Sequence, residues 1–323
     1  MGKLIGKIAV FLLGIAAAVI LIIVLSASNS TLDRFFSIIS CSSEYTTKEE
    51  ALKIDTIERA KRSDNTYKKL IVGDSVSYFM FTPLQDYNDE YFIGSTNRPF
   101  TMAGQYVVIE EFLKSHPDAQ EVYLFFSKDS WESVIDPQCG YQNTVVPFVK
   151  TNVLEDLDQS TIEEMRQQYG SLLMTPTFIN LYYNSMMNHK LTLNGIIAYH
   201  EKILGEDCSK MYETTPGRLS PLAQLYLQKA IDLCNELGVK FYLVHNPLAD
   251  TEAKHAELEQ EKEDFRVSGF MDIAKGYFDS VMYYPIEQFA DGVHYGTTPQ
   301  LQRDAIRDII DKTGYMKDLV IEP

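Results

Sequence analysis

Basic residues are scarce in this chain of 323 residues. Lysine and arginine number 29 against 45 aspartates and glutamates, which gives a formal net charge of −16. Proteins that bind nucleic acid take much of their affinity from lysine and arginine side chains that displace counterions from the phosphates. The charge balance therefore argues against nucleic acid as a partner and leaves a small neutral ligand open.

Cysteine is equally rare, with four residues in the chain. The sequence contains neither a C-x-x-C motif nor a cysteine and histidine cluster with zinc spacing, so we expect no metal and no cofactor. Four cysteines allow three complete pairings, and the sequence does not choose among them. Cys139 and Cys208, in a loop-rich middle section, are the first candidates for a disulfide with Cys41 left over, whereas the apolar helical pattern around Cys234 predicts a buried free thiol.

Charged residues are absent from positions 8 to 27. A helix of about 20 apolar residues spans about 30 Å of hydrocarbon. Lys3 and Lys7 precede this run and Asp33 follows it, so the positive-inside rule predicts a single-pass cell-membrane protein with a cytoplasmic N-terminus and an extracytoplasmic main domain. A cleaved signal peptide ending near Ser26-Ala27-Ser28 is the alternative, but the run exceeds the usual core of about 7–15 residues.

Strand and helix patterns alternate after residue 67. Apolar runs of strand type occupy residues 70–72, 91–93, 121–126, 239–244 and 281–284, and helical patterns cover 102–115, 221–237 and a segment from Pro299 onward. This alternation predicts an α/β fold of three layers, α/β/α, with a mostly parallel sheet. In such a sheet, ligands bind outside the carboxyl ends of the strands.

We divide the chain into a cytoplasmic tip and transmembrane anchor (1–28), a polar linker that forms a stalk or a membrane-proximal helix (29–66) and one main domain (67–323). An irregular insertion at about 130–217 interrupts this domain, with a short helix predicted at 161–169 and another at 194–204. The insertion is rich in aromatic residues, which form either a wall for stacking on sugars or ordinary packing and a lid. These residues are Trp131, Tyr141, Phe148, Tyr182 and Tyr183.

Two distant segments carry side chains suited to nucleophilic catalysis. Gly73-Asp74-Ser75 follows the first predicted strand of the domain, and Asp291-Gly292-Val293-His294 lies just before the last predicted helix. A serine is a weak nucleophile at its own pKa and needs a base, which itself needs an orienting group. Ser75, His294 and Asp291 can supply these three roles if the fold brings the segments together. We expect Asp74 to bond to its own turn.

The two motifs resemble the SGNH/GDSL superfamily of serine esterases and acyltransferases over residues 68–312. The resemblance implies an SGNH or flavodoxin-like fold, Ser75 as nucleophile, His294 as general base and Asp291 as the group that orients it. It also implies Gly104 as the oxyanion-hole glycine. With the N-terminal apolar run, the chain is most similar to the cell-envelope branch that modifies teichoic acids, alginate and peptidoglycan.

The family's Gly-x-Asn-Asp block is missing, since the third strand is followed by Phe126-Ser127-Lys128-Asp129-Ser130. The loss of one oxyanion donor can cost roughly 2.7–4 kcal/mol of transition-state stabilisation. Ser127, Asn246 and Asn97 are the candidates to replace this donor, with a role in turns or caps as the alternative for each. His245 either lines the site or closes the end of a strand.

The resemblance implies an O-acyltransferase or esterase acting on O-acyl groups of cell-envelope glycans, with a membrane-bound O-acyltransferase as the partner that delivers the acyl group. A plain carbohydrate esterase or deacetylase is one alternative. A catalytically inactive scaffold in an envelope-polymer complex is the other, and the missing asparagine block favours it.

Overall fold

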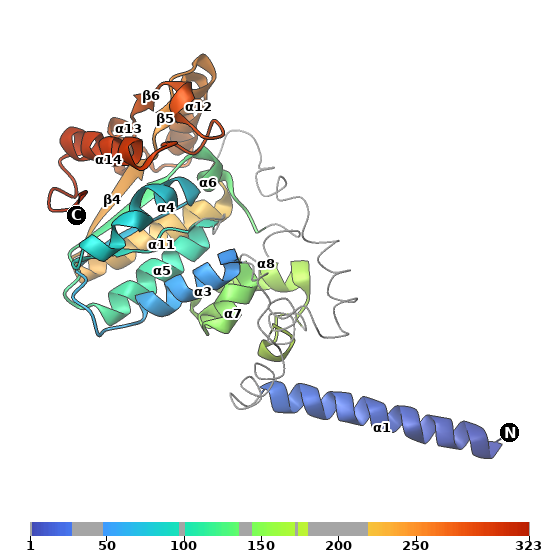
Figure 1. The fold of residues 1–323 in the computed structure, drawn as a ribbon. Helices are drawn as coiled ribbons and strands as arrows, with labels where there is room; N and C mark the ends of the chain where they lie inside the picture. The colour runs from blue at the N-terminus through green and yellow to red at the C-terminus, as the bar shows by residue number, and fades with distance from the viewer. Residues whose placement is uncertain are drawn as a thin grey trace.

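Four parallel strands form the main sheet of the computed structural model, which describes residues 2–27, 48–96, 101–135, 144–171, 174–179 and 219–322. The strands are β1 (Lys69–Gly73), β2 (Tyr91–Ile93), β3 (Glu121–Phe126) and β4 (Lys240–His245). Their order across the sheet is β2-β1-β3-β4, and every neighbouring pair is parallel (Figure 1). The predicted α/β class with a parallel sheet is confirmed.

Apolar side chains on both faces of the strands make two separate cores. Leu70 and Val72 of β1 belong to one core, whereas Ile71 between them belongs to the other. This alternation follows from the pleat, because successive side chains of a strand point to opposite faces. Helices pack against both cores, an arrangement compatible with the predicted three layers.

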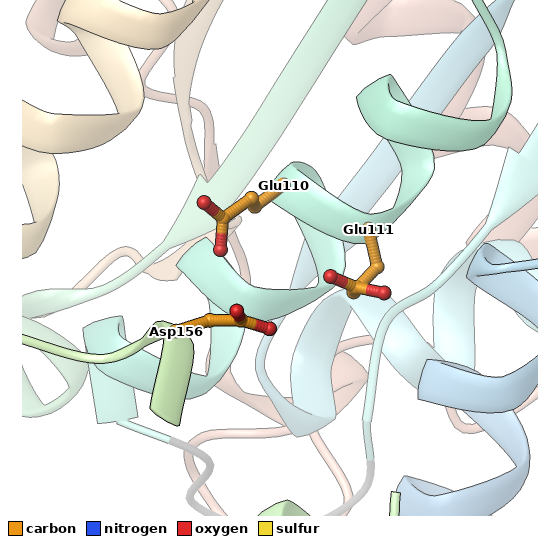
Figure 2. Close-up of side chains that lie close together, drawn as sticks. All are labelled: Glu110, Glu111 and Asp156. Carbon is orange, nitrogen blue, oxygen red and sulfur yellow. The ribbon is translucent and has the colours of Figure 1, made fainter. Parts of the chain in front are cut away.

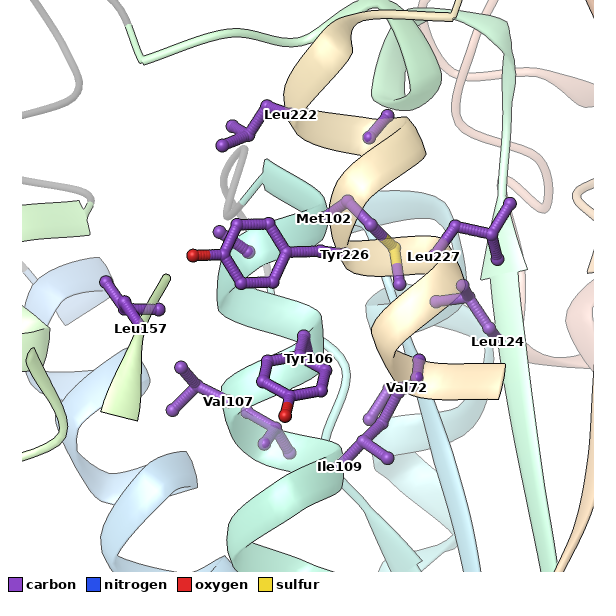
Figure 3. Close-up of a cluster of buried hydrophobic side chains, with 14 of the residues drawn as sticks. Val72, Met102, Tyr106, Val107, Ile109, Leu124, Leu157, Leu222, Tyr226 and Leu227 are labelled. Atoms are coloured by element: carbon purple, nitrogen blue, oxygen red, sulfur yellow. The ribbon is translucent and has the colours of Figure 1, made fainter. Parts of the chain in front are cut away.

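The larger core lies beneath α5 (Thr101–Ser115) and α11 (Pro221–Leu237), which pack closely against each other. Figure 3 shows Met102 and Tyr106 of α5 beside Tyr226 and Leu227 of α11, above the strand residues Val72 and Leu124. Each large side chain buried in this way contributes about 1.5–3 kcal/mol. The predicted bounds of α11 are confirmed, with Ser220 as the N-cap and Gly238 in the left-handed region at the C-terminal end.

A helix also occupies the second half of the predicted linker. This helix, α3 (Lys48–Ala60), packs against α5, and its residues Ile57 and Ala60 are fully buried in the larger core. The folded domain therefore begins earlier than the predicted boundary at residue 67. The sequence pattern did not reveal this packing, because the segment has alternating charges and few apolar residues on its buried face.

The opposite face of the sheet is covered by α4 (Ser75–Phe81) and α14 (Pro299–Thr313). Thr298 caps α14, with Pro299 in its first turn, as the sequence predicts. On this helix Ala305, Ile306 and Ile309 are fully buried. A short 3-10 helix, η1 (Thr82–Tyr87), continues from α4 toward β2.

The last predicted strand is not part of the main sheet. β6 (Tyr283–Tyr284) pairs only with β5 (Leu248–Ala249), in a separate two-stranded parallel sheet. The chain leaves the main sheet at Asn246-Pro247, and β6 pairs with this departing segment. Helices α12 (Glu252–Val267) and α13 (Met271–Asp279) lie between β5 and β6 in the chain, and η5 (Ile286–Gln288) follows.

Parts of the predicted insertion are well packed. It contains α6 (Lys128–Glu132), α7 (Val146–Lys150), η3 (Leu154–Asp156) and α8 (Gln159–Tyr169), the last of which was predicted as a short helix. Trp131 and Phe148 are buried in the larger core, so these two aromatic residues serve packing. The other three aromatic residues, the predicted helix at 194–204 and Cys41, Cys139 and Cys208 lie outside the described residues. Cys234 is buried and free as predicted, and burial raises its pKa to about 12.

The first helix, α1 (Gly2–Ala27), covers the predicted apolar run. Within the part of the chain that the structure describes, no helix combines the length and the apolar character needed to cross a membrane.

Candidate active site

The candidate site lies at the carboxyl ends of the central strands. The chain passes from β1 to β2 on one side and then returns to β3 on the other side of β1. The gap between β1 and β3 is therefore the topological switch point, where parallel α/β sheets bind their ligands. Ser75 follows the end of β1, Ser127 follows β3, and Asn246 follows β4.

Ser75 is the first residue of α4 and is presented by a tight turn after β1. Asp74 is the N-cap of this helix, and its Oδ1 accepts a hydrogen bond of 3.0 Å from the Val76 backbone N–H. The predicted role of Asp74 in its own turn is confirmed. The turn leaves the Ser75 hydroxyl half-buried and facing the end of the sheet.

The turn requires glycine at position 73, because the neighbouring atoms leave no room for a side chain. A Cβ atom at this position would overlap with the backbone oxygen of Phe125 and with the Ser77 hydroxyl. We expect Gly73→Ala to lower the free energy of unfolding by at least about 1–3 kcal/mol, the usual cost of overpacking, and to displace Ser75. Urea unfolding and the rate of ester hydrolysis would measure the two effects.

Gly276→Ala is a suitable control for this substitution. Gly276 lies within α13, and an added Cβ would meet only the Tyr315 hydroxyl at 3.0 Å. Alanine is also preferred to glycine within a helix by about 0.5–1 kcal/mol, so we expect little net change in stability. If Gly73→Ala were as stable and active as Gly276→Ala, the proposed steric requirement would be wrong.

His294 lies between the serine and an aspartate, although the serine is 219 positions away in the chain. Its Nε2 is 2.8 Å from Ser75 Oγ, and its Nδ1 is 2.7 Å from Asp291 Oδ2. The three predicted residues therefore form a continuous hydrogen-bonded chain. Because a carboxylate can only accept, Nδ1 carries the proton, and Nε2 of the neutral imidazole accepts from the Ser75 hydroxyl.

Asp291 is fixed by the loop that it begins. Its Oδ1 accepts from the backbone N–H groups of Val293 at 3.1 Å and His294 at 2.8 Å, and Gly292 provides the positive φ of 81° that the loop needs. These backbone bonds, together with the imidazole, lower the Asp291 pKa to about 2. The carboxylate thus stabilises the folded state above about pH 4, and this contribution is lost as the pH falls toward about 2.

Phe79 holds the imidazole from the side. The Phe79 ring meets the His294 ring edge-on, with centroids 5.4 Å apart and an interplanar angle of 87°. Phe79 is 40% exposed, and Val293, which precedes His294 in the chain, is 43% exposed. The histidine therefore has an apolar rim on the solvent side.

Ser127 and Asn246, the predicted candidates for the missing oxyanion donor, both donate a hydrogen bond to Asp74. Asn246 Nδ2 donates to Asp74 Oδ1 at 2.8 Å, and Ser127 Oγ donates to Asp74 Oδ2 at 3.1 Å. Ser130, which the sequence did not single out, donates to the same Oδ2 at 2.7 Å. Burial raises the Asp74 pKa, and these donors oppose that rise. This carboxyl group thus joins the ends of β1, β3 and β4.

A cavity of about 340 Å³ opens beside Ser75 and His294. Helix α5 reaches its wall through Thr101 and Gln105. Gly104 is buried in the first turns of α5 and is not among the lining residues, so the predicted oxyanion glycine does not face the cavity. Sequence reasoning missed Thr101 and Gln105, although Thr101 lies three residues before Gly104 and Gln105 one residue after it, which could have indicated them. Asn97 lies outside the described residues.

His245 supports the end of β4 and does not line this cavity. Its Nδ1 is 2.5 Å from the Asn246 carbonyl oxygen and its Nε2 is 3.2 Å from Glu261 Oε2. Since a carbonyl oxygen can only accept, His245 Nδ1 carries a proton. The contact between His245 Nε2 and Glu261 Oε2 then requires one further proton, on the imidazole or on the carboxyl group. Tyr277 donates to the other Glu261 oxygen at 2.6 Å. This buried network holds the backbone next to Asn246.

One cluster of carboxylates has the spacing of a metal site. Figure 2 shows Glu110 and Glu111 on α5 close to Asp156 of η3. Lys114 provides a positive charge for all three, at 2.8 Å from Glu111 and 3.6 Å from both Glu110 and Asp156. The chain's own lysine thus neutralises much of this cluster.

Comparisons with protein-family models, with curated proteins and with solved structures found no match to this chain.

Proposed function

We propose that this protein is a serine acyl-ester enzyme of the SGNH type, acting as an O-acyltransferase or esterase on O-acyl groups of cell-envelope glycans. One observation carries the proposal. Ser75, His294 and Asp291 form a hydrogen-bonded chain with contacts of 2.8 and 2.7 Å at the carboxyl ends of parallel strands. Nucleophile, base and orienting acid in this order are the arrangement that activates a serine hydroxyl.

The reaction would proceed in two displacements. His294 Nε2 takes the Ser75 proton as Oγ attacks the ester carbonyl, and the same proton then passes to the departing alcohol. The acyl group is left on Ser75. A second hydroxyl, from water or from an acceptor sugar, repeats these steps in reverse and releases the free acid or the new ester. The Ser75 backbone N–H, at the start of α4, is the candidate oxyanion donor.

The proposed location and partner rest on the sequence and on the resemblance. The uncharged run of residues 8–27 supports a single-pass anchor in the cell membrane with the main domain outside the cytoplasm. The resemblance to the envelope branch supports a membrane-bound O-acyltransferase as the donor of acyl groups. An enzyme anchored beside such a partner could pass acyl groups to a glycan near the membrane surface.

The test uses the full chain in detergent with a nitrophenyl ester, with and without an oligosaccharide acceptor. We expect mass spectrometry of the quenched reaction to find the acyl group on the peptide that contains Ser75. Acylated oligosaccharide would identify a transferase, and free acid alone would identify an esterase. If no acyl-enzyme forms and neither product appears, the protein is not an acyl-ester enzyme, and a scaffold role becomes the better explanation.

A further inference from the structure

Two buried side chains on α5 line the cavity, and each has one polar atom without a partner among the described residues. Gln105 is 1% exposed and Thr101 is 3% exposed, and both line the same cavity as Ser75 and His294. Among the described residues, neither Gln105 Oε1 nor Thr101 Oγ1 has a hydrogen-bond partner. Buried polar atoms are nearly always paired, and an unpaired one in a cavity wall marks a position where a ligand can bind.

The orientation of the Gln105 amide is fixed by the strand that leads to the nucleophile. Gln105 Nε2 donates to the backbone oxygen of Gly73 at 2.9 Å. Since this carbonyl only accepts, the amide nitrogen must face it, and the amide oxygen must face away from it. Gln105 Oε1 is therefore an acceptor, which selects for a ligand group that donates a hydrogen bond.

The other hydroxyl groups of the wall already donate within the protein. Ser127 and Ser130 donate to Asp74, and Ser133 donates to the backbone oxygen of Ser130 at 2.8 Å. Gln105 Oε1 and Thr101 Oγ1 are thus buried polar atoms of the wall residues that have no hydrogen-bond partner among the described residues.

The charges around the cavity restrict the ligand further. Asp74, Asp129 and Asp291 line it, and none of its described lining residues is a lysine or an arginine. A ligand with a carboxylate or phosphate would meet like charges and no cation to bind it. A neutral ligand with hydroxyl groups satisfies both the acceptor on Gln105 and the hydroxyl of Thr101.

We propose that Gln105 and Thr101 form a subsite that binds a hydroxyl group of a neutral, polyhydroxylated ester beside Ser75. This rests on the proposed acyl-ester function and adds the residues that select the substrate. The two residues contact the part of the substrate that does not react. They therefore govern the preference for a sugar ester over an ester without hydroxyl groups.

The experiment compares two esters that differ in hydroxyl groups. The full chain in detergent is assayed separately with a mono-O-acetylated methyl glucoside and with cyclohexyl acetate. The cyclohexyl ring has a similar size to the sugar ring but carries no hydroxyl groups. We expect wild type to prefer the sugar ester in kcat/KM. Gln105→Met and Thr101→Val should each lower this preference by roughly 10–100-fold, because each leaves a substrate hydroxyl unpaired.

Gln302→Met is the matched control. The Gln302 amide also donates to a glycine carbonyl, that of Gly296 at 3.1 Å, but Gln302 does not line the cavity. Its preference should equal that of wild type. An unchanged preference in both cavity variants would overturn the subsite. An equal loss with both esters would also overturn it, since it would show that Gln105 only positions the Ser75 turn. In either case acylation of Ser75 in wild type would leave the proposed function standing, whereas its absence would count against that function.

Discussion

Ser75→Ala is expected to remove covalent labelling by a fluorophosphonate and to lower ester turnover by roughly 10⁴-fold or more. A fluorophosphonate forms its bond to a serine oxygen that a neighbouring base has activated, and the alanine has no such oxygen. The loss in turnover is large because the nucleophile and base act as a unit, and the remaining groups supply only binding and oxyanion stabilisation.

The substitution should leave the fold intact. The described hydrogen bond of the Ser75 hydroxyl is the one to His294, at a half-exposed position outside the core, so its loss costs about 1 kcal/mol or less. Unchanged thermal unfolding would separate the loss of chemistry from a loss of structure.

Ser77→Ala provides the matched control for Ser75→Ala. Ser77 lies two residues further along the same helix, but its hydroxyl donates to the backbone oxygen of Asp74 at 2.8 Å and is turned away from His294. This variant should be labelled like wild type and lose only about 0.5–1.5 kcal/mol of stability. Labelling of Ser75→Ala at the wild-type rate, on Ser127 or Ser130 for example, would refute the assignment of Ser75.

The sequence predicted the strands and helices well where the local pattern and the packing agree. Strands β1 to β4 and helices α5 and α11 lie within one or two residues of their predicted bounds, and α14 begins at the predicted Pro299. Each has an apolar pattern of the right period, and α11 and α14 begin with a capping side chain followed by proline. The predicted meeting of Ser75 and His294 rested on the resemblance and on placing residues 281–284 in the same parallel sheet. That strand, β6, lies in a separate sheet, although the two side chains do meet.

The errors concern side chains whose role depends on their tertiary neighbours. Ser127 and Asn246 lie at the predicted strand ends, and each donates one hydrogen bond to the Asp74 carboxyl group. No local pattern reveals these contacts, because the partners come from three strands. Gln105 was missed because a glutamine within an apolar helix carries no motif. Its importance follows only from the Gly73 carbonyl and the cavity on either side of it.

Asp291→Asn is expected to lower kcat/KM by roughly 10³–10⁴-fold, together with the loss of the stability that the charged carboxylate contributes above about pH 4. The reason is the proton on the imidazole. Oδ1 of residue 291 must keep accepting from the backbone N–H groups of Val293 and His294, since an amide NH₂ turned toward them would place donors against donors. The asparagine therefore presents its NH₂ group to His294 Nδ1. Nδ1 must then accept, the imidazole proton moves to Nε2, and Nε2 can no longer take the proton of Ser75.

Asp291→Ala separates this tautomer effect from the loss of the carboxylate charge. Alanine leaves the imidazole free to adopt either tautomer but removes both backbone bonds of the loop. We therefore expect Asp291→Ala to be no less active than Asp291→Asn, although the loop loses more stability. The two variants are compared by measuring turnover across about pH 5–9 and the thermal unfolding of each.

The wild-type carboxylate stays charged over this whole range, because the Asp291 pKa is lowered to about 2. Any acid limb of the wild-type pH profile therefore arises from another group. Activity of Asp291→Asn within tenfold of wild type would show that Nε2 still accepts the serine proton, and that Asp291 does not set the tautomer of His294.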